Sequence, residues 1–564
     1  MLDTEPTVVP YADAPEVETP SRMPGEILVS TLALAACGGG GSTPSGGSTG
    51  SSPPPPPAPP PSPPPPTISD TQASRFLAQS AMGSSRADIA EVVSMGYAGW
   101  LDAQFAKPRG QTLWDYLVAQ GYNNATYINS EAGFDPSMWR ALLAEPDQLR
   151  QRVATALLEI MVVGISGLNV SWRQFALAAY VDVLFDNAFG NFRTLLDKIT
   201  TNAGMATFLT FLGNKKANAA TGAEPDENYA RELMQLFTLG LRQLNADGTE
   251  KTPAQETYVP ADVSGLARVF TGLTLDSADN STPDRLRRPL IFNAGQHETG
   301  VSTFLGATVP AGTDGAGAVK IALDTIFAHP NVGPFVSRQL IQRLVTSNPS
   351  AAYVGRVAAV FANNGSGTRG DLKATVRALL LDDEARTVPT GANAGKLREP
   401  VMRLTGWARA FGATSASNAW PIGDTSSQNN RLGESMGRSP SVFNWWRPGY
   451  VPPATTLSAA GLVAPEFQVT NEVSTIAYIN FMQTLIQNGM GDFKADYTAI
   501  TAKAADSAAL VDEVNIIVAA GQLSAATIAT IRSAVDSIAA ANTANRVYTA
   551  ILLTMASPDY LTLR

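Results

Sequence analysis

The chain has 564 residues, of which 44% are hydrophobic and 16% are charged. This composition provides enough apolar material for a sizeable core and excludes a mainly disordered protein. The net charge of −9 excludes the basic field that nucleic-acid binding requires, and the single cysteine excludes an internal disulfide framework and a multi-cysteine zinc site.

The only cysteine lies at the end of a short apolar run near the N-terminus. Residues 27 to 36 form this run, and Leu34-Ala35-Ala36-Cys37 places small residues directly before the thiol. The arrangement resembles a bacterial lipobox, whose cysteine is acylated and becomes the mature N-terminus. We therefore expect residues 1–36 to be a signal peptide region and Cys37 to be a lipid anchor. The alternative is an incidental cysteine in a disordered tail.

The residues before the apolar run are acidic, whereas a signal peptide begins with positive charge. Five acidic residues precede a single cation, Arg22: Asp3, Glu5, Asp13, Glu16 and Glu18. This departure leaves the true start of the protein open.

The segment after Cys37 is predicted to be a tether. Residues 38–69 contain no charged residue, and they change from a Gly/Ser-rich stretch to a proline tract between Pro53 and Pro66. Such a tract favours polyproline II and forms a semi-rigid spacer of roughly 40 Å, at ~3.1 Å per residue. A proline-rich ligand for a recognition domain is the alternative. Gly38, rather than Asp, follows the cysteine and predicts an outer-membrane location in the cell envelope.

Helical periodicity dominates residues 70–564, so we predict an all-α fold with one large multi-helix domain. Apolar residues recur at helical spacing after Asp147, again from Phe335 to Val345, and through an alanine-rich stretch that Gly521 interrupts. Asp147 is a possible N-cap. Asp247-Gly248 is a turn signal, so residues 245–258 are a candidate β-hairpin between helices. No apolar run in this block approaches the ~20 residues of a membrane-spanning helix.

Many collinear stretches resemble the domain-of-unknown-function family 1800, a family of exported, helical bacterial proteins. The most distinctive is Glu227-Asn228-Tyr229-Ala230-Arg231-Glu232-Leu233, which continues to Gly240 and looks like the family's signature helix. Other matching stretches are 75–77, 100–104, 148–153, 262–272, 297–306, 329–330, 396–400, 439–445 and 557–561. The family usually has His-Asp where this chain has His297-Glu298. Its members are commonly encoded beside a protein of domain-of-unknown-function family 1501, which the resemblance therefore implies as a companion.

The signature helix carries several candidate functional residues. A rotation of ~100° per residue places Tyr229, Leu233, Leu236 and Phe237 on one apolar face, and Gly240 suits a left-handed C-cap. Arg231 is expected to pair with Glu227, four residues earlier. Glu232 is either a general acid or base or metal ligand, or a buried hydrogen-bonding hub. Asn228, Tyr229 and Arg231 are candidate ligand contacts.

The chain has two histidines, so a mechanism that needs an imidazole must use one of them. His329 precedes Pro330 and is expected to cap a helix C-terminus. His297 lies beside Glu298 in a polar, glycine-containing stretch, where functional residues concentrate. His297 is therefore the catalytic candidate, and a hydrogen-bonded structural histidine is its alternative.

Two short motifs are rejected on their context. Residues 365–370 fit a dinucleotide-binding pattern but lie between predicted helices, without a preceding strand. Residues 433–437 fit a nucleophile elbow around Ser435, yet both histidines precede that serine. No metal-ligand spacing supports a zinc or calcium site, although Glu224, Asp226 and Glu227 form an acidic group. An aromatic groove is a further alternative, formed by Trp100, Trp139, Trp445, Trp446 and Tyr450.

Two functional hypotheses follow from the sequence. The first is a lipid-anchored binding or assembly module of the cell envelope. The second is an envelope hydrolase or metal-dependent enzyme that uses His297, Glu298 and Glu232. The sequence assigns no cofactor to either.

Overall fold

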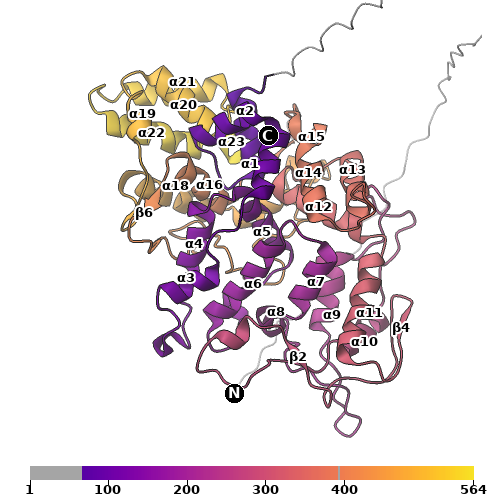
Figure 1. Cartoon of the computed structure of the whole chain (residues 1–564). Coiled ribbons are helices and arrows are strands. Elements are labelled where there is room, and N and C mark those ends of the chain that lie inside the picture. The colour runs from indigo at the N-terminus through magenta and orange to yellow at the C-terminus, as the bar shows by residue number, and fades with distance from the viewer. Residues whose placement is uncertain (1–66, 392–393) are drawn as a thin grey trace, which may run out of the picture. The chain divides into compact units, whose positions relative to one another are not determined.

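Helices account for nearly all the regular structure of the described residues (Figure 1). The computed structural model describes residues 67–391 and 394–564. Within them the predicted all-α class is confirmed, because every strand is only two or three residues long. Cys37, the signal peptide region and residues 38–66 of the tether lie outside the described residues.

The first helices pack around α5 and α6. Their bounds are α1 (Asp70–Ser80), α2 (Arg86–Ala106), α3 (Leu113–Ala119), η1 (Ala125–Tyr127), α4 (Phe134–Ala144), α5 (Gln148–Ile160), η2 (Ile165–Gly167), α6 (Arg173–Asn187), α7 (Phe192–Thr200) and α8 (Ala203–Phe208). Two of them begin with a capping box, in which Ser69 pairs with Gln72 and Ser85 with Asp88. Such caps satisfy N–H groups that a helix leaves without partners.

The middle of the chain contains the signature helix and the long helices that pack beside it. The bounds are α9 (Asn228–Glu232), the π-helix η3 (Leu233–Thr238), α10 (Pro260–Val269), η4 (Asp284–Leu286), α11 (Gly315–Ala328), α12 (Val332–Leu344), α13 (Ala351–Ala362), α14 (Leu372–Leu381) and α15 (Asp383–Arg386). The helix predicted from Phe335 to Val345 is α12. Residues 365–370 connect α13 to α14, as their context predicted.

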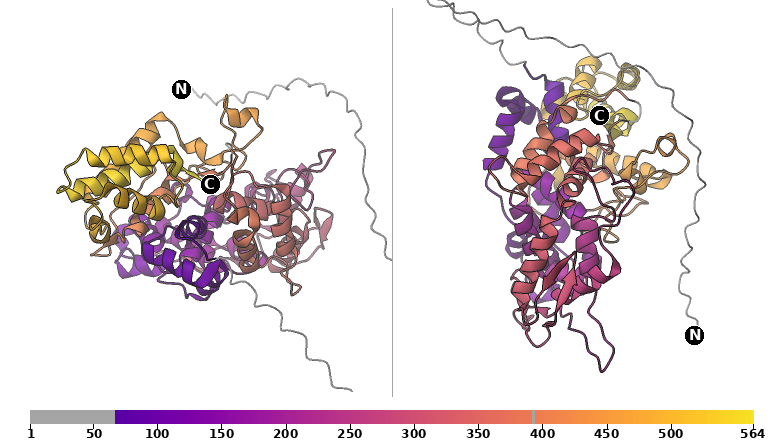
Figure 2. Two further views of the ribbon diagram at one scale, coloured as in Figure 1. Left: turned by 90° about the horizontal axis from the view of Figure 1, so that it is seen from above. Right: turned by 90° about the vertical axis from the view of Figure 1, so that its right-hand side faces the viewer.

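The last helices include the predicted alanine-rich group. Their bounds are α16 (Pro400–Ala410), α17 (Thr456–Ala459), η5 (Pro465–Val469), α18 (Glu472–Asn488), α19 (Thr498–Thr501), α20 (Ser507–Ile517), α21 (Ala525–Asp536), α22 (Thr543–Ala556) and α23 (Pro558–Leu561). The helices α20, α21 and α22 lie side by side (yellow in Figure 2). Gly521, in a left-handed conformation with φ of 70°, lies in the connection before α21.

Four short antiparallel strand pairs join the helices. They are β1 (Leu273–Thr274) with β2 (Ile291–Phe292), β3 (Ser302–Phe304) with β4 (Ala307–Val309), β5 (Lys396–Leu397) with β8 (Thr562–Leu563), and β6 (Thr414–Ser415) with β7 (Phe493–Lys494). In the predicted hairpin region, Gly248 has a φ of 76° and the backbone N–H of Asn245 donates to Thr249 at 2.7 Å. This region forms isolated β-bridges rather than regular strands.

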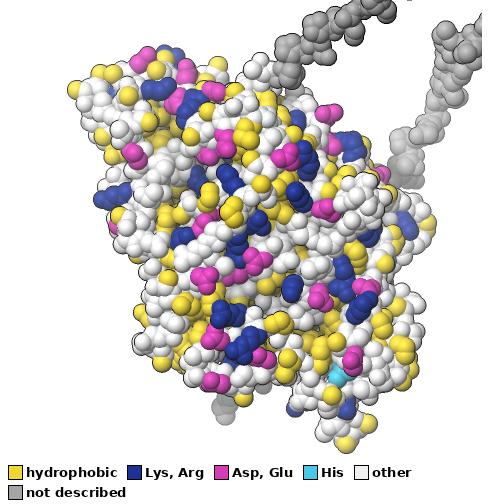
Figure 3. Space-filling model, viewed as in Figure 1, with side chains coloured by type: hydrophobic (Ala, Val, Ile, Leu, Met, Phe, Trp, Pro, Cys, Tyr) yellow, Lys and Arg dark blue, Asp and Glu magenta, His cyan; other side chains and the backbone are white. Residues whose placement is uncertain are grey.

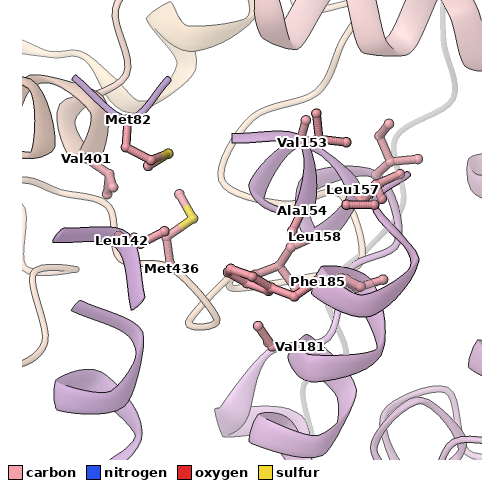
Figure 4. Close-up of a cluster of buried hydrophobic side chains, with 14 of the residues drawn as sticks. Met82, Leu142, Val153, Ala154, Leu157, Leu158, Val181, Phe185, Val401 and Met436 are labelled. Carbon is pink, nitrogen blue, oxygen red and sulfur yellow. The ribbon is translucent and has the colours of Figure 1, made fainter. Parts of the chain in front are cut away.

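The core lies along α5 and α6. Val153, Leu157 and Leu158 of α5 face Val181 and Phe185 of α6 in a cluster of buried apolar side chains (Figure 4). The apolar spacing correctly predicted a helix here, whereas burial extends around nearly all of α5 and includes Gln151, Arg152 and Glu159. Asp147 occupies the predicted N-cap position, but its side chain caps no N–H group and instead accepts a hydrogen bond from Gln151.

The surface carries both signs of charge. On the face shown in Figure 3, Lys and Arg side chains are interspersed with Asp and Glu. No helix in the described part of the chain combines the length and the apolar composition that a membrane crossing requires.

Candidate functional site

A cavity of about 420 Å³ lies between α12, the C-terminal end of α5 and the π-helix η3, and is called the α5–α12 cavity below. Its size is within the range of small-molecule sites. Its lining comprises Glu159, Ile160, Gln235, Leu236, Leu239, Gly240, Leu241, Arg242, Leu244, Glu250, Phe335, Arg338, Gln339, Gln342, Arg343, Val442, Phe443, Pro448, Gly449 and Val463. About half of these side chains are apolar, so the cavity suits a ligand with an apolar body.

One face of α12 forms a wall of the cavity. The lining residues Phe335, Arg338, Gln339, Gln342 and Arg343 recur at intervals of three, one, three and one residues. This spacing places them on one side of an α-helix. The opposite side of α12 carries fully buried apolar residues: Val336, Leu340, Ile341 and Leu344. Core packing therefore fixes the rotation of α12 and turns its polar stripe toward the cavity.

The π-helix η3 forms a second wall. Its wider turns are visible in the hydrogen bond from the Leu239 N–H to the Met234 carbonyl, at 2.8 Å. Such segments are rare and are frequent at functional sites. Leu236 and Leu239 face the cavity. Gly240 then ends the helix with a φ of 74°, as predicted for a left-handed cap, and a Cβ there would lie 2.9 Å from the Phe335 ring.

Asn331 fixes the chain that leaves η3 against the start of α12. Its amide donates to the carbonyls of Leu239 at 3.0 Å and Arg242 at 2.7 Å, and its side-chain oxygen accepts the Leu244 N–H at 2.9 Å. Asn331 is 1% exposed. One buried amide therefore holds two walls of the cavity at a fixed separation.

Glu159 and Arg343 form the charged floor of the cavity. Arg343 Nε lies 3.6 Å from Glu159 Oε2, and both side chains are buried. The two Nη atoms of Arg343 donate to Gln339 and to the Glu159 carbonyl, whereas Nε has no hydrogen-bond acceptor. No N–H or hydroxyl donor reaches the Glu159 carboxyl within the described chain. The floor therefore has hydrogen-bonding capacity that the protein leaves unused.

A cluster of buried charges continues behind this floor. Lys396 Nζ lies 2.9 Å from Glu399 Oε1 and also contacts Glu466, and Arg152 donates to the Arg343 carbonyl at 2.6 Å. Trp446 lies between the two sites, with its ring centroid 5.0 Å from the Arg343 guanidinium carbon and 5.3 Å from Lys396 Nζ. Such buried charges are costly unless they are paired.

The cluster shifts the pKa values of two neighbouring glutamates in opposite directions. Burial raises the pKa of Glu159 well above its usual range, and the adjacent Glu399 carboxylate raises it further. Burial also acts to raise the pKa of Glu399, but Lys396, Arg152 and a hydrogen bond from Glu159 outweigh it and lower that pKa. The surroundings therefore favour the neutral form of Glu159 and the ionised form of Glu399.

Burial and neighbouring charges also set the pKa values of Lys396, Glu434 and Glu466. Burial acts to lower the pKa of Lys396, but Glu399 and Glu466 raise it overall. Burial raises the pKa of Glu466 and raises that of Glu434 to about 8. The surroundings thus favour the charged form of Lys396 and the neutral forms of Glu434 and Glu466.

His297 and Glu298 meet at Thr271. Nδ1 of His297 lies 2.9 Å from the Thr271 carbonyl, and the Glu298 N–H donates to the Thr271 hydroxyl at 2.8 Å. His297 is 2% exposed and packs its ring edge to face against Phe292, and its Nε2 has no partner in the described chain. These contacts hold His297 in place, and neither residue lines the α5–α12 cavity.

The contacts of Glu232 are separate from those of His297 and Glu298. Burial raises its pKa against the influence of Arg231, and its Oε2 has no hydrogen-bond donor within the described residues. No hydrogen bond or ion pair in that part of the chain joins Glu232 to His297 or Glu298. The three proposed catalytic residues therefore share no contact that would serve proton transfer.

The candidate ligand contacts of the signature helix have structural partners. Tyr229 is 1% exposed, stacks on Phe211 with 4.1 Å between ring centroids and bonds to Thr200 through its hydroxyl at 2.6 Å. Arg231 forms the predicted surface pair with Glu227, at 3.0 Å. The side-chain amide of Asn228 donates to the Thr210 hydroxyl at 3.4 Å, and Asn228 does not line the α5–α12 cavity.

The other sequence motifs also have structural roles. His329 is the C-cap of α11, as predicted, and its Nδ1 accepts the Asn331 N–H at 3.1 Å. Ser435 is buried and has no histidine partner. Trp100, Trp139 and Trp446 are core residues rather than a groove. The described residues contain no group of three or more acidic, histidine or cysteine side chains that could hold a metal ion.

Sequence reasoning missed the cavity residues Glu159, Arg343 and Asn331 and the ion cluster around Lys396. One signal was present, because residues 396–400 resemble the family and include the charged residues Lys396, Arg398 and Glu399. Their burial does not follow from the sequence, and Lys396 and Glu399 are 3% and 0% exposed.

The fold and the cavity define a class of protein: a large helical domain with one face of α12 open to a small-molecule-sized cavity above a buried ion cluster. The family model for "Protein of unknown function (DUF1800)" matches residues 75–562. The chain therefore belongs to this family. No curated protein and no solved structure matches it.

Proposed function

We propose that the protein is an envelope lipoprotein whose helical domain binds a small organic ligand in the α5–α12 cavity. The observation that carries this proposal is the cavity itself, whose volume of about 420 Å³ and half-apolar lining suit a small organic molecule. Ligand sites in proteins are cavities of this size with apolar walls and a few polar groups.

Ligand binding is tested with protein purified from the envelope. Denaturing mass spectrometry of the released small molecules should find at least one compound that accompanies the wild-type chain. Leu236→Trp fills the cavity from η3 and should lose that compound. Ile476→Trp is the matched control, because Ile476 is 62% exposed on α18 and does not line the cavity. An identical set of compounds from all three proteins would rule the proposal out.

The proposed anchor is an acyl chain on Cys37. The small residues before it, the uncharged Gly/Ser/Pro tether after it and its status as the only cysteine support this assignment. Gly38 favours the outer membrane. The Cys37→Ser chain should leave the membrane fraction, and its retention there would contradict the anchor.

A companion of domain-of-unknown-function family 1501 is the proposed partner, on the strength of the family resemblance. Affinity purification of the full chain from envelope extract should recover it. Its absence from repeated purifications would remove this part of the proposal. The alternative function, a hydrolase or metal-dependent enzyme that uses His297, Glu298 and Glu232, gains no support from their contacts.

A further inference from the structure

Three exposed arginines lie at the mouth of the α5–α12 cavity. Arg242 and Arg338 are exposed lining residues. Arg447 is also exposed, and its guanidinium carbon lies 4.5 Å from the ring centroid of the lining residue Phe443. None of the three guanidinium groups forms an ion pair or donates a hydrogen bond within the described chain. Their N–H groups therefore remain accessible to a ligand.

The three arginines come from separate segments that meet at one face of α12. Asn331, the N-cap of α12, donates to the Arg242 carbonyl at 2.7 Å. Arg338 follows Asn331 by seven residues, which is about two turns and returns to the same side of the helix. Gln342, on the cavity face of α12, donates to the carbonyl of Pro448, the residue after Arg447, at 3.5 Å. Backbone contacts therefore hold all three arginines around one opening.

Two acidic side chains lie near these arginines and leave them unoccupied. Glu250 lines the cavity, and Glu256 lies opposite Arg242 in an isolated bridge. Both acids are exposed, and neither forms an ion pair with a described lysine or arginine. They reduce the positive charge of the mouth, but they do not use the N–H groups that an anion would bind.

The floor of the cavity does not provide a comparable site for a charged group. Arg343 and Glu159 are 2% and 3% exposed and lie beside one another. Their atoms therefore offer a ligand almost no accessible surface. The charged end of a ligand belongs at the exposed mouth, where the arginines are.

The walls between mouth and floor are apolar. Leu236 and Leu239 of the η3 segment face Phe335 of α12, and Val442 and Phe443 belong to the loop that carries Arg447. Such walls suit hydrocarbon, because burial of apolar surface stabilises a complex in proportion to its area.

From this geometry we infer that the ligand is an amphipathic phosphomonoester, with its apolar tail between η3 and α12 and its phosphate at the mouth. This inference rests on the proposed function, and it adds the chemical class of the ligand. A phosphomonoester has three terminal oxygens, so it can accept hydrogen bonds from Arg242, Arg338 and Arg447 together, whereas a carboxylate has two.

The test compares four ligands by isothermal titration calorimetry with the full chain in its Cys37→Ser form. Octyl phosphate should bind with one-to-one stoichiometry. Octanoate and octan-1-ol should bind at least about ten-fold more weakly, because they offer the arginines fewer charged oxygens or none. Inorganic phosphate, which lacks the tail, should show no measurable binding. Leu236→Trp should abolish octyl phosphate binding, whereas Ile476→Trp should leave it unchanged.

Variants of the mouth test the phosphate position without changing a buried residue. The double variant Arg242→Gln/Arg338→Gln should weaken octyl phosphate binding by at least about ten-fold and leave octan-1-ol binding unchanged. Arg288→Gln/Arg532→Gln is the matched control, because it removes two exposed arginines that do not line the cavity. An equal effect of the two double variants would overturn the assignment of the phosphate to the mouth.

The outcomes separate the inference from the proposed function. If octanoate or octan-1-ol binds as tightly as octyl phosphate and Leu236→Trp abolishes that binding, the phosphate class is wrong while the cavity remains a binding site. If inorganic phosphate binds as tightly as octyl phosphate, the tail has no role and the inference is wrong. If no ligand binds in a manner sensitive to Leu236→Trp, the inference is overturned, and the released-compound experiment with envelope-purified protein decides the proposed function independently.

Discussion

Arg343 Nε lies 3.6 Å from Glu159 Oε2, and this contact joins two helices through side chains that are 2% and 1% exposed. The two residues are 184 positions apart in the chain. Their pairing places a guanidinium beside a carboxyl whose pKa burial raises well above its usual range, at the floor of a cavity.

Glu159 and Glu399 should differ in how much the same substitution costs. The pKa of Glu159 is raised well above its usual range, so the neutral amide of Glu159→Gln should change the free energy of unfolding at pH 7 by less than about 1 kcal/mol. Glu399→Gln removes an ionised partner from Lys396 and should cost about 3–5 kcal/mol. Urea denaturation measures both values. Equal losses for the two variants would contradict the assigned protonation states.

Glu434 should make stability fall as the pH rises. Its pKa in the folded protein is about 8, above the usual value of 4.5, because the carboxyl is buried. Its stabilising contribution is therefore complete below pH 4.5 and is lost as the pH rises through about 8. Glu434→Gln should remove this loss and raise the melting temperature at pH 9 by ~2–5 °C. Melting temperatures of both proteins from pH 5 to pH 9 provide the test, and parallel curves would refute it.

Gly240→Ala should destabilise the protein through contact as well as backbone strain. A left-handed non-glycine residue costs ~1–2 kcal/mol, and the new Cβ would lie 2.9 Å from the Phe335 ring, which adds ~1–3 kcal/mol. Gly213→Ala is the matched control, since Gly213 has a φ of 76° and no atom within 4 Å of the added Cβ. Chemical denaturation of both variants isolates the contact. A Gly240→Ala loss no larger than that of Gly213→Ala would contradict the close packing of η3 on α12.

His297→Ala should reduce stability by ~2–4 kcal/mol, because it removes a buried hydrogen bond to Thr271 and the contact with Phe292. Glu298→Ala, at a half-exposed position, should cost less than about 1 kcal/mol. Folded protein of either variant should still carry the compound that accompanies the wild-type chain, as measured by denaturing mass spectrometry. A stable His297→Ala protein without ligand binding would instead indicate a functional role for the imidazole.

Local features of the site followed from the sequence because they depend on neighbours within one or two helical turns. The apolar spacing identified α5 and α12 as helices. Gly240 identified the end of the signature helix, and the Glu227–Arg231 pair followed from a separation of four residues. The π-helix η3 was not predicted, because its wider hydrogen bonding depends on packing rather than on a distinct sequence period.

The sequence by itself determined the helical class, the end of the signature helix at Gly240 and the family resemblance, because apolar periodicity and capping residues act locally. Only the tertiary structure decided which charges are buried. Lys396 and Glu466 are 70 positions apart and meet through the folding of distant segments. In the sequence each is an ordinary charged residue. Burial and proximity, which arise only when those segments pack together, shift the pKa of Glu159 and leave Arg343 with an unused N–H group at the floor of the cavity.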